Sequence, residues 1–595
     1  MKRKDAIKFF TAILLGFFLL PGANADAKQH AHEHGDKKLS RPNILMILAD
    51  DLGYSDISPF GGEIRTPNLD RLADSGITMT NFYANQSCSP TRAALMSGTD
   101  THIAGLGVMF EMRFGLASPA QMNANGYQGY LLPGLETLPR KLQEAGYHTY
   151  MAGKWHLANL QGGLGTTIPA ARGFERSFAL MQGGASHFGD GLGALPSMIP
   201  VGMPGHNQRA LYVEDLVINT TLPTDFYSTT HYTDKLIEYI ESNRGDGRPF
   251  FAYAAYTAPH WPLQLPNEAL EEGNIWQKKF RMYEKSYQAG YEVIGKRRLA
   301  RMARLGIIKR GTEPNPWDEF GGGEGIPAWN SLSNQERKTK AREMAIYSVM
   351  VEYMDYQIGR LLKHVDQDTT MVVFMSDNGA EATVPTEYWG LTPDPNSVTE
   401  YENLLKTVAG TDDYNGYENL GRPGSYLAYD AGWTRVSALP HRGYKMMTTE
   451  GGIRVPLIAR IPGMKKRGTV SDAFGHVMDL MPTFLHAAQA EHPNHDLRGS
   501  SMIPLLTGKQ STIHGDDYGI GWEMLGGKAY IEDGYKLFMQ APTLGGLGTW
   551  ELYDLIDDQG ENYNLIDDPD YADRADYLLE RYNQYADETG VVPFP

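Results

Sequence analysis

The sequence contains a single cysteine, Cys88, in 595 residues. A lone cysteine excludes an intrachain disulfide framework and a cysteine-rich zinc site. Positive charge is also scarce, because the formal net charge is −17 at pH 7. That acidity argues against nucleic acid as a partner. For Cys88 itself, three interpretations remain open: a small buried apolar residue, half of an intermolecular disulfide, or a chemically special residue.

No apolar run has the length and purity of a transmembrane helix. The N-terminal run at residues 9–20 follows basic residues 2–4 and precedes small residues at positions 23 and 25. This order is typical of a secretory signal peptide. We therefore predict a signal peptide over residues 1–25 and a periplasmic or secreted protein without stable membrane insertion. A signal anchor is the alternative.

The next segment, residues 26–40, is polar and predicts a disordered linker before the folded part. Its histidines, His30, His32 and His34, could bind a metal ion. A solvated linker is the simpler interpretation of the same residues.

Several short apolar runs predict buried strands of a mainly parallel sheet. The first is residues 43–49, and the others precede Lys154, His260 and Asp377. An amphipathic helix is expected between residues 338 and 364, because its apolar residues recur every three or four positions. Alternating strands and helices predict an α/β fold: a large mixed or mostly parallel sheet sandwiched by helices. Functional groups in such folds gather beyond the carboxyl ends of the strands.

The C-terminal part has a different pattern, with short strands followed by a helix at about residues 572–585. Asp533-Gly534 is expected to form the tight turn of a hairpin. We therefore predict a catalytic domain over residues 41–455 and a smaller subdomain, with an antiparallel sheet and a helix, over residues 456–595. Near the N-terminus, Thr66 is expected to cap a helix that begins at Pro67.

Two oxygen-rich pairs, Asp50-Asp51 and Asp377-Asn378, each end an apolar strand. Carboxylate and amide oxygens are hard ligands that suit Ca²⁺ or Mg²⁺. Each pair alone could equally be a turn or a helix cap. Their occurrence at two strand ends of one sheet favours a metal site.

Five basic groups could surround this metal: Arg92, Lys154, His156, His260 and Lys445. Lys154 and His156 stand at i and i+2, so within a strand they would point to the same side. Each group alone is more typical of a structural histidine or a solvated cation. Together they suit a tetrahedral oxyanion and predict a metal-dependent hydrolase of oxyanion esters, still without a nucleophile.

The nucleophile is supplied by a resemblance. Cys88-Ser89-Pro90-Thr91-Arg92 and the following "AALMSGTD" resemble the C-x-P-x-R signature of type I sulfatases, within the alkaline phosphatase-like superfamily. Further similar stretches, "PNILMILADDLGYSD", "AGKWHL" and "FMSDNGAE", cover nearly the whole chain after the linker. The chain looks most like the bacterial arylsulfatases.

The resemblance implies that Cys88 is oxidised to Cα-formylglycine by a formylglycine-generating enzyme or a radical maturase. In the family the hydrated aldehyde attacks sulfur, and loss of a proton from its second hydroxyl releases sulfate. The resemblance also implies one Ca²⁺, with Mg²⁺ as the less favoured ion. Its ligands would be the modified Cys88 and Asp50, Asp51, Asp377 and Asn378.

The remaining roles are likewise implied by the resemblance. Arg92 and Lys154 would hold the diol, and His156 would accept the proton of its second hydroxyl. His260 and Lys445 would contact sulfate and assist the leaving oxygen.

We expect a small aryl or alkyl sulfate as substrate, and hydrolysis of an aryl sulfate is the reaction that we predict. Three alternatives stay open: a sulfatase of sulfated carbohydrates, a phosphonate or phosphate ester hydrolase of the same superfamily, and a binding protein that has lost catalysis.

Overall fold

The computed structural model describes residues 41–594, apart from short gaps at 114, 162–163, 199–200, 203–205, 220, 317–324, 384–385, 388–391 and 393. The predicted signal peptide and linker lie outside the described residues. Among the helices of the described part, none combines the length and apolarity needed to cross a membrane.

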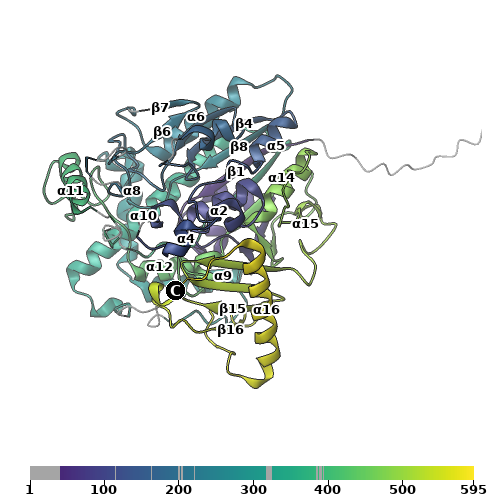
Figure 1. Ribbon diagram of the computed structural model, residues 1–595. Coiled ribbons are helices and arrows are strands. Elements are labelled where there is room, and N and C mark those ends of the chain that lie inside the picture. The colour runs from purple at the N-terminus through teal and green to yellow at the C-terminus, as the bar shows by residue number, and fades with distance from the viewer. Residues whose placement is uncertain are drawn as a thin grey trace, which may run out of the picture. The chain divides into compact units, whose positions relative to one another are not determined.

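A ten-stranded sheet forms the centre of this unit (Figure 1). In spatial order its strands are β11 (Thr469–Ser471), β2 (Ile77–Met79), β10 (Leu457–Arg460), β9 (Thr370–Ser376), β1 (Asn43–Ala49), β8 (Phe250–Ala255), β4 (His148–Lys154), β5 (Arg176–Leu180), β6 (Tyr212–Glu214) and β7 (Val217–Asn219). The five strands from β9 to β5 are mutually parallel, while β10, β6 and β7 run antiparallel to their neighbours. The predicted α/β fold with a mixed, mostly parallel sheet is confirmed.

Strand β1 shows why its sequence is apolar at almost every position. Leu45 and Ile47 pack into one buried apolar cluster, and Ile44 and Met46 pack into another. Because successive side chains of a strand point to opposite faces, a strand covered on both sides needs apolar residues throughout.

Helices cover both faces of the sheet. The cluster containing Leu45 receives side chains from α1 (Pro67–Ser75), α6 (Ser228–Ser242), α8 (Ile275–Tyr287), α9 (Tyr291–Leu305), α10 (Asn334–Leu362) and α12 (Ala431–Ala438). The cluster containing Ile44 receives them from α2 (Cys88–Ser97), α5 (Leu138–Glu144), α14 (Leu480–Ala488) and α15 (Ile503–Leu506). The long helix predicted over 338–364 is α10.

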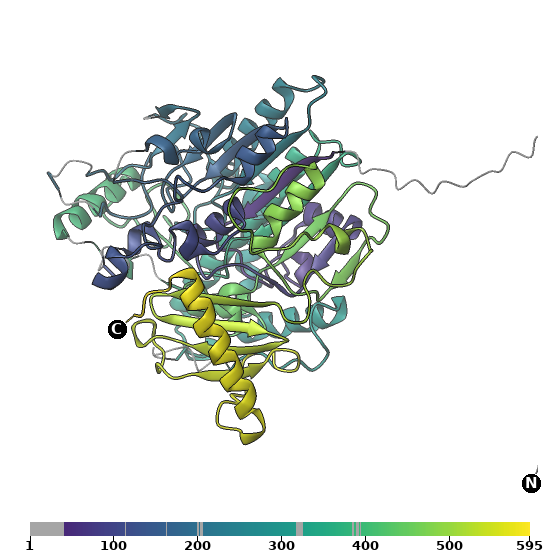
Figure 2. The same cartoon turned by 45° about the vertical axis from the view of Figure 1, so that its right-hand side comes forward.

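The C-terminal part forms a four-stranded antiparallel sheet of β13 (Gly519–Met524), β14 (Gly527–Glu532), β15 (Tyr535–Met539) and β16 (Glu551–Asp554). The last helix, α16 (Ala572–Thr589), lies across this sheet (Figures 1 and 2). Asp533 and Gly534 both have positive φ and close the predicted hairpin between β14 and β15. The predicted antiparallel sheet with one helix is confirmed.

Two expectations differ from the structure. Strands β10 and β11 follow residue 455 yet pair with β9 and β2, so the large sheet continues beyond the boundary that we predicted. Thr66 precedes α1 but makes no side-chain cap. Its hydroxyl instead accepts the N–H of Ser58, and Asp355 of α10 accepts the N–H groups of Asn68 and Leu69.

Candidate active site

Four adjacent strands bring the predicted site residues to one edge of the large sheet. Asp50 and Asp51 directly follow β1, and Asp377 and Asn378 directly follow β9. Lys154 is the last residue of β4. Since β9, β1, β8 and β4 lie side by side in this order and run parallel, their carboxyl ends meet at the same edge, as the sequence predicted.

Helix α2 supplies two further side chains from its first turns. Cys88 is its first residue, only 2% exposed, and Arg92 is fully buried one turn later. Burial raises the pKa of the Cys88 thiol well above its usual value. An unmodified thiol here stays protonated, and a protonated thiol is a weak nucleophile.

Two of the cations are paired with carboxylates from the strand ends. Lys154 Nζ lies 2.8 Å from both oxygens of Asp50. Arg92 Nη2 lies 2.7 Å from Asp377 Oδ2, and Arg92 Nη1 donates to the carbonyl of Lys154. These contacts join α2, β4 and β9 into one rigid unit.

Lys445 reaches the site from the loop between α12 and α13 (Glu450–Ile453). Its Nζ lies 2.9 Å from Asp51 Oδ1 and 3.3 Å from a carboxylate oxygen of Glu381. Burial opposes ionisation of Asp51, but Lys445 and His260 lower its pKa to about 2. The Asp51 carboxylate is therefore charged at neutral pH.

The two predicted histidines occupy different surroundings. His260 Nε2 lies 3.5 Å from Asp51 Oδ2, beside the carboxylates. His156 has φ 57°, so the chain leaves the strand after Lys154 and strand alternation does not set its direction. The prediction that Lys154 and His156 share one side of a strand is wrong for this reason. His156 Nε2 instead lies 3.0 Å from Glu111 Oε2.

The residues present fit a hard divalent cation. Donor atoms of Asp50, Asp51, Cys88 and His260 lie within 4.8 Å of one another. Asn378 donates its amide to Asp51, while its carbonyl oxygen Oδ1 is buried without a partner among the described residues. A buried, unpaired carbonyl oxygen beside carboxylates is the donor that Ca²⁺ or Mg²⁺ would satisfy. Asp377 adjoins this group, since its Oδ1 accepts the N–H of Asp51 at 3.3 Å.

The charges of the buried site match an anionic ligand. Three aspartates, Asp50, Asp51 and Asp377, face three cations, Arg92, Lys154 and Lys445. A divalent cation would leave this set positively charged. That charge would attract an anionic ester and stabilise negative charge on its leaving oxygen.

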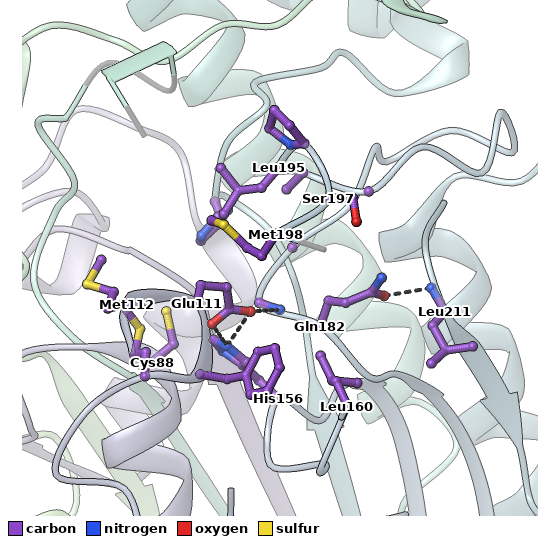
Figure 3. A pocket seen from close by; sticks show the side chains of 18 of the residues that line it. Cys88, Glu111, Met112, His156, Leu160, Gln182, Leu195, Ser197, Met198 and Leu211 are labelled. Carbon is purple, nitrogen blue, oxygen red and sulfur yellow. Dashed lines mark hydrogen bonds and ion pairs between the residues drawn. The ribbon is translucent and has the colours of Figure 1, made fainter. Parts of the chain in front are cut away.

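A pocket opens over these groups (Figure 3). Cys88, His156, His260 and Lys445 contribute to its lining. Much of the remaining wall is apolar and is formed by Met109, Phe110, Met112, Leu195, Met198 and Trp261. The structure thus combines polar and charged lining residues with an apolar wall in one cavity.

Two site residues were not predicted from the sequence. Glu111 lines the pocket in a short 3-10 turn, Phe110–Met112, and Glu381 follows β9 by a few residues. The position of Glu381 after Asp377 and Asn378 was a usable signal. Nothing in the sequence around Glu111 marks it, because the segment lacks periodicity and its partner His156 is 45 residues away.

The fold and the site define a hydrolase of anionic esters, with a mixed sheet covered by helices on both faces. The chain belongs to the sulfatase family: the model of the Sulfatase family matches residues 42–490. A second model, "N-sulphoglucosamine sulphohydrolase, C-terminal", matches residues 442–588. The protein is therefore a sulfuric ester hydrolase.

Similar proteins agree with this assignment. An uncharacterised sulfatase of Schizosaccharomyces pombe is 39% identical over 93% of this chain and 95% of its own. An arylsulfatase of Klebsiella aerogenes is 34% identical over 80% of this chain and 92% of its own. The solved structure of Ps i-CgsB in complex with k-i-k-neocarrahexaose is 21% identical, with a TM-score of 0.59 over 92% of this chain and 93% of that one, a likeness of fold.

Proposed function

We propose that this sulfatase hydrolyses aryl sulfates with Cα-formylglycine, formed from Cys88, as nucleophile and one bound Ca²⁺. The observation that carries the proposal is the position of Cys88. Its side chain lines the pocket, and its sulfur lies within 4.8 Å of donor atoms of Asp50 and Asp51. The only cysteine of the chain thus stands between the carboxylates and the cavity.

In this proposal formylglycine supplies a hydrated aldehyde and Ca²⁺ supplies a Lewis acid. Asp50, Asp51, Asp377 and Asn378 would hold the ion, with Ca²⁺ favoured over Mg²⁺ because the site offers several buried protein oxygens, whereas Mg²⁺ usually keeps several of its waters.

The basic residues would perform the remaining tasks. Arg92 and Lys154, both fully buried and fixed by ion pairs, hold residue 88 and balance the aspartates. His260 and Lys445 line the pocket beside Asp51 and contact the sulfate and the leaving oxygen. His156 accepts a proton during release of sulfate.

The apolar wall supports an aromatic leaving group. Met109, Met112 and Trp261 offer thioether and ring surfaces that pack well against an aryl ring. The arylsulfatase relative points the same way. A carbohydrate sulfatase is the second candidate, because Ps i-CgsB, which is similar in fold, was solved in complex with k-i-k-neocarrahexaose.

A substrate panel tests this proposal. We expect kcat/KM to be highest for phenyl sulfates and lower for sulfated monosaccharides. It should be lowest for the matching phosphate mono- and diesters. A preference for sulfated sugars would replace aryl by carbohydrate sulfate as the substrate. A preference for phosphate or phosphonate esters would overturn the proposal.

Maturation and metal are tested separately. Mass spectrometry of the peptide containing Cys88, from protein made in its native host, should show the aldehyde in place of the thiol. We propose a formylglycine-generating enzyme or radical maturase as the source, and export through residues 1–25. Removal of metal by a chelator should abolish activity, and Ca²⁺ should restore it better than Mg²⁺. Active protein that carries only thiol would exclude this mechanism.

A further inference from the structure

Glu111 is an acidic residue in a pocket that must bind an anionic ester. Figure 3 shows its carboxylate joined to His156, in the pocket that Cys88 also lines. Both carboxylate oxygens lie within hydrogen-bond distance of His156 Nε2, at 3.2 and 3.0 Å. The contact joins a loop residue to the histidine that follows β4.

The two ring nitrogens of His156 are therefore distinct. Nε2 faces a carboxylate, which accepts hydrogen bonds, so Nε2 carries the hydrogen of the neutral ring. Nδ1 is buried and has no hydrogen-bond partner among the residues that the structure describes. His156 itself lines the pocket, and Nδ1 is the ring nitrogen whose lone pair stays unpaired.

The charge states agree with this arrangement. Burial lowers the pKa of His156 below its usual value, although Glu111 acts in the opposite direction. Burial would raise the pKa of Glu111, but His156 holds it at about 2. Near neutral pH the pair is an ionised carboxylate and a neutral imidazole.

The pair is also fixed in place by its neighbours. The N–H of Gly183 lies 3.3 Å from Glu111 Oε1. A Cβ at position 183 would lie 2.8 Å from His156 Cε1 and 2.9 Å from Nε2, which is too close for a side chain. Only glycine allows this backbone to cover the ring, so the close packing of all three residues holds the imidazole in one orientation.

We propose that Glu111 is a positioning residue that holds His156 as the tautomer protonated at Nε2, so that Nδ1 accepts the proton when sulfate leaves. This inference rests on the proposed role of His156. The proton comes from the hydroxyl on residue 88, whose electron pair restores the carbonyl there as the bond to sulfate breaks. The Glu111 carboxylate then stabilises the imidazolium, as a buried aspartate does in hydrolase triads.

The central test is E111Q, which keeps the shape of the side chain and removes its charge. We expect kcat for an aryl sulfate to fall at least about 10-fold, with KM changed less than about threefold. The acidic limb of the kcat–pH profile should move to lower pH, because the imidazolium loses its anionic partner. E111D, which restores the charge, should recover part of kcat.

The matched control is E241Q. Glu241 accepts from Nδ1 of His364 at 2.7 Å in an exposed Glu–His pair on the surface. Loss of this carboxylate should leave kcat, KM and the pH profile unchanged. Wild-type kcat in E111Q, or an equal loss in E241Q, would overturn the positioning role.

A second measurement is independent of turnover. Nitrogen-15 NMR of histidine-labelled C88A protein, with His156 assigned from H156Q, should show the neutral ring protonated at Nε2. In E111Q the tautomer mixture should shift toward Nδ1–H. An Nδ1–H ring in the C88A protein would overturn the inference even if sulfatase activity is found. Absence of sulfatase activity in the wild type would instead count against the proposed function alone.

Discussion

At the scale of single residues, Cys88 carries the most specific prediction. C88A should reduce kcat/KM for aryl sulfates by at least about a thousandfold, because it removes the proposed nucleophile. The loss in unfolding free energy should be small, about 1 kcal/mol, since one buried sulfur atom is removed. Steady-state kinetics and thermal unfolding of the same preparation check both parts. Residual activity near the wild-type level would place the nucleophile elsewhere.

A second residue, His102, makes stability depend on pH. It is fully buried, with Nδ1 3.0 Å from Asp100 and Nε2 3.0 Å from Glu523. Three more groups donate to these carboxylates: Tyr127, Tyr585 and Gln121. Burial opposes the charge on the ring, but the hydrogen bonds to Asp100 and Glu523 raise its pKa to about 9.

This raised pKa fixes the sign of the effect. The protonated His102 ring stabilises the folded state. This stabilisation is fully present below 6.5, the pKa of His102 in the unfolded chain, and is lost as pH rises through its folded-state pKa of about 9. The difference between the two values corresponds to about 3 kcal/mol. The gap in unfolding free energy between wild type and H102Q should therefore shrink by about this amount from pH 6 to pH 10. Denaturant unfolding at several pH values measures it, with the exposed His364 changed to Gln as control; a constant gap would contradict it.

At the scale of elements, helix α1 depends on a residue of another helix. Asp355 of α10 accepts the N–H groups of Asn68 and Leu69 at the start of α1, which has no cap from Thr66. D355A should lower the unfolding free energy by about 2 kcal/mol, because the buried N–H of Leu69 and the half-buried N–H of Asn68 lose their acceptor. D355N, which keeps one carbonyl oxygen, should cost less. If Thr66 were the real cap, T66A would cost more than D355A in the same denaturant experiment.

The same example shows what the sequence could and could not predict. The start of α1 is encoded locally by Pro67, whereas its cap comes from a residue 287 positions away. Strands β1, β4, β8 and β9 were predictable because each is an apolar run that ends in polar residues. The meeting of Asp50, Asp51, Lys154, Asp377 and Asn378 was predictable for the same reason, since the carboxyl ends of parallel strands lie at one edge of the sheet.

Glu111 represents the opposite case. Its function is defined only by contact with His156 and Gly183, which lie on other loops. Loop contacts of this kind follow from packing and leave no periodic pattern in the chain. The pocket wall as a whole was unpredictable for this reason, and so was the continuation of the large sheet through β10 and β11.

At the scale of the whole molecule, a buried charge cluster joins the C-terminal sheet to the rest. Lys536 of β15 lies 3.0 Å from Glu450 Oε1 and 2.7 Å from Glu561 Oε1, and all three side chains are fully buried. K536M leaves Glu561 without its ion-pair partner and leaves Glu450 with Arg454 as its remaining cation, and it should cost about 3–5 kcal/mol. Denaturant unfolding followed by both fluorescence and loss of activity should give one shared transition.

The matched control is the double variant K536M/E561Q, which removes the Lys536 and Glu561 charges together and keeps the Glu450–Arg454 ion pair. It should recover most of the stability that K536M loses, because the penalty arises from unpaired buried charge. A loss below about 1 kcal/mol in K536M would show that the cluster does not hold the two sheets together.

Because the chain has a single, buried cysteine, a count of free thiols reports on the proposed maturation of Cys88. The folded chain shields Cys88 from thiol reagents, since only 2% of the residue is exposed. Unfolding exposes at most one thiol per chain, because the sequence has no other cysteine. If Cys88 is converted to formylglycine as proposed, the thiols per chain that a colorimetric reagent counts in denaturant give the fraction of chains left unconverted. The thiol count per chain can be measured for a preparation from any host before its activity is compared with that of another preparation.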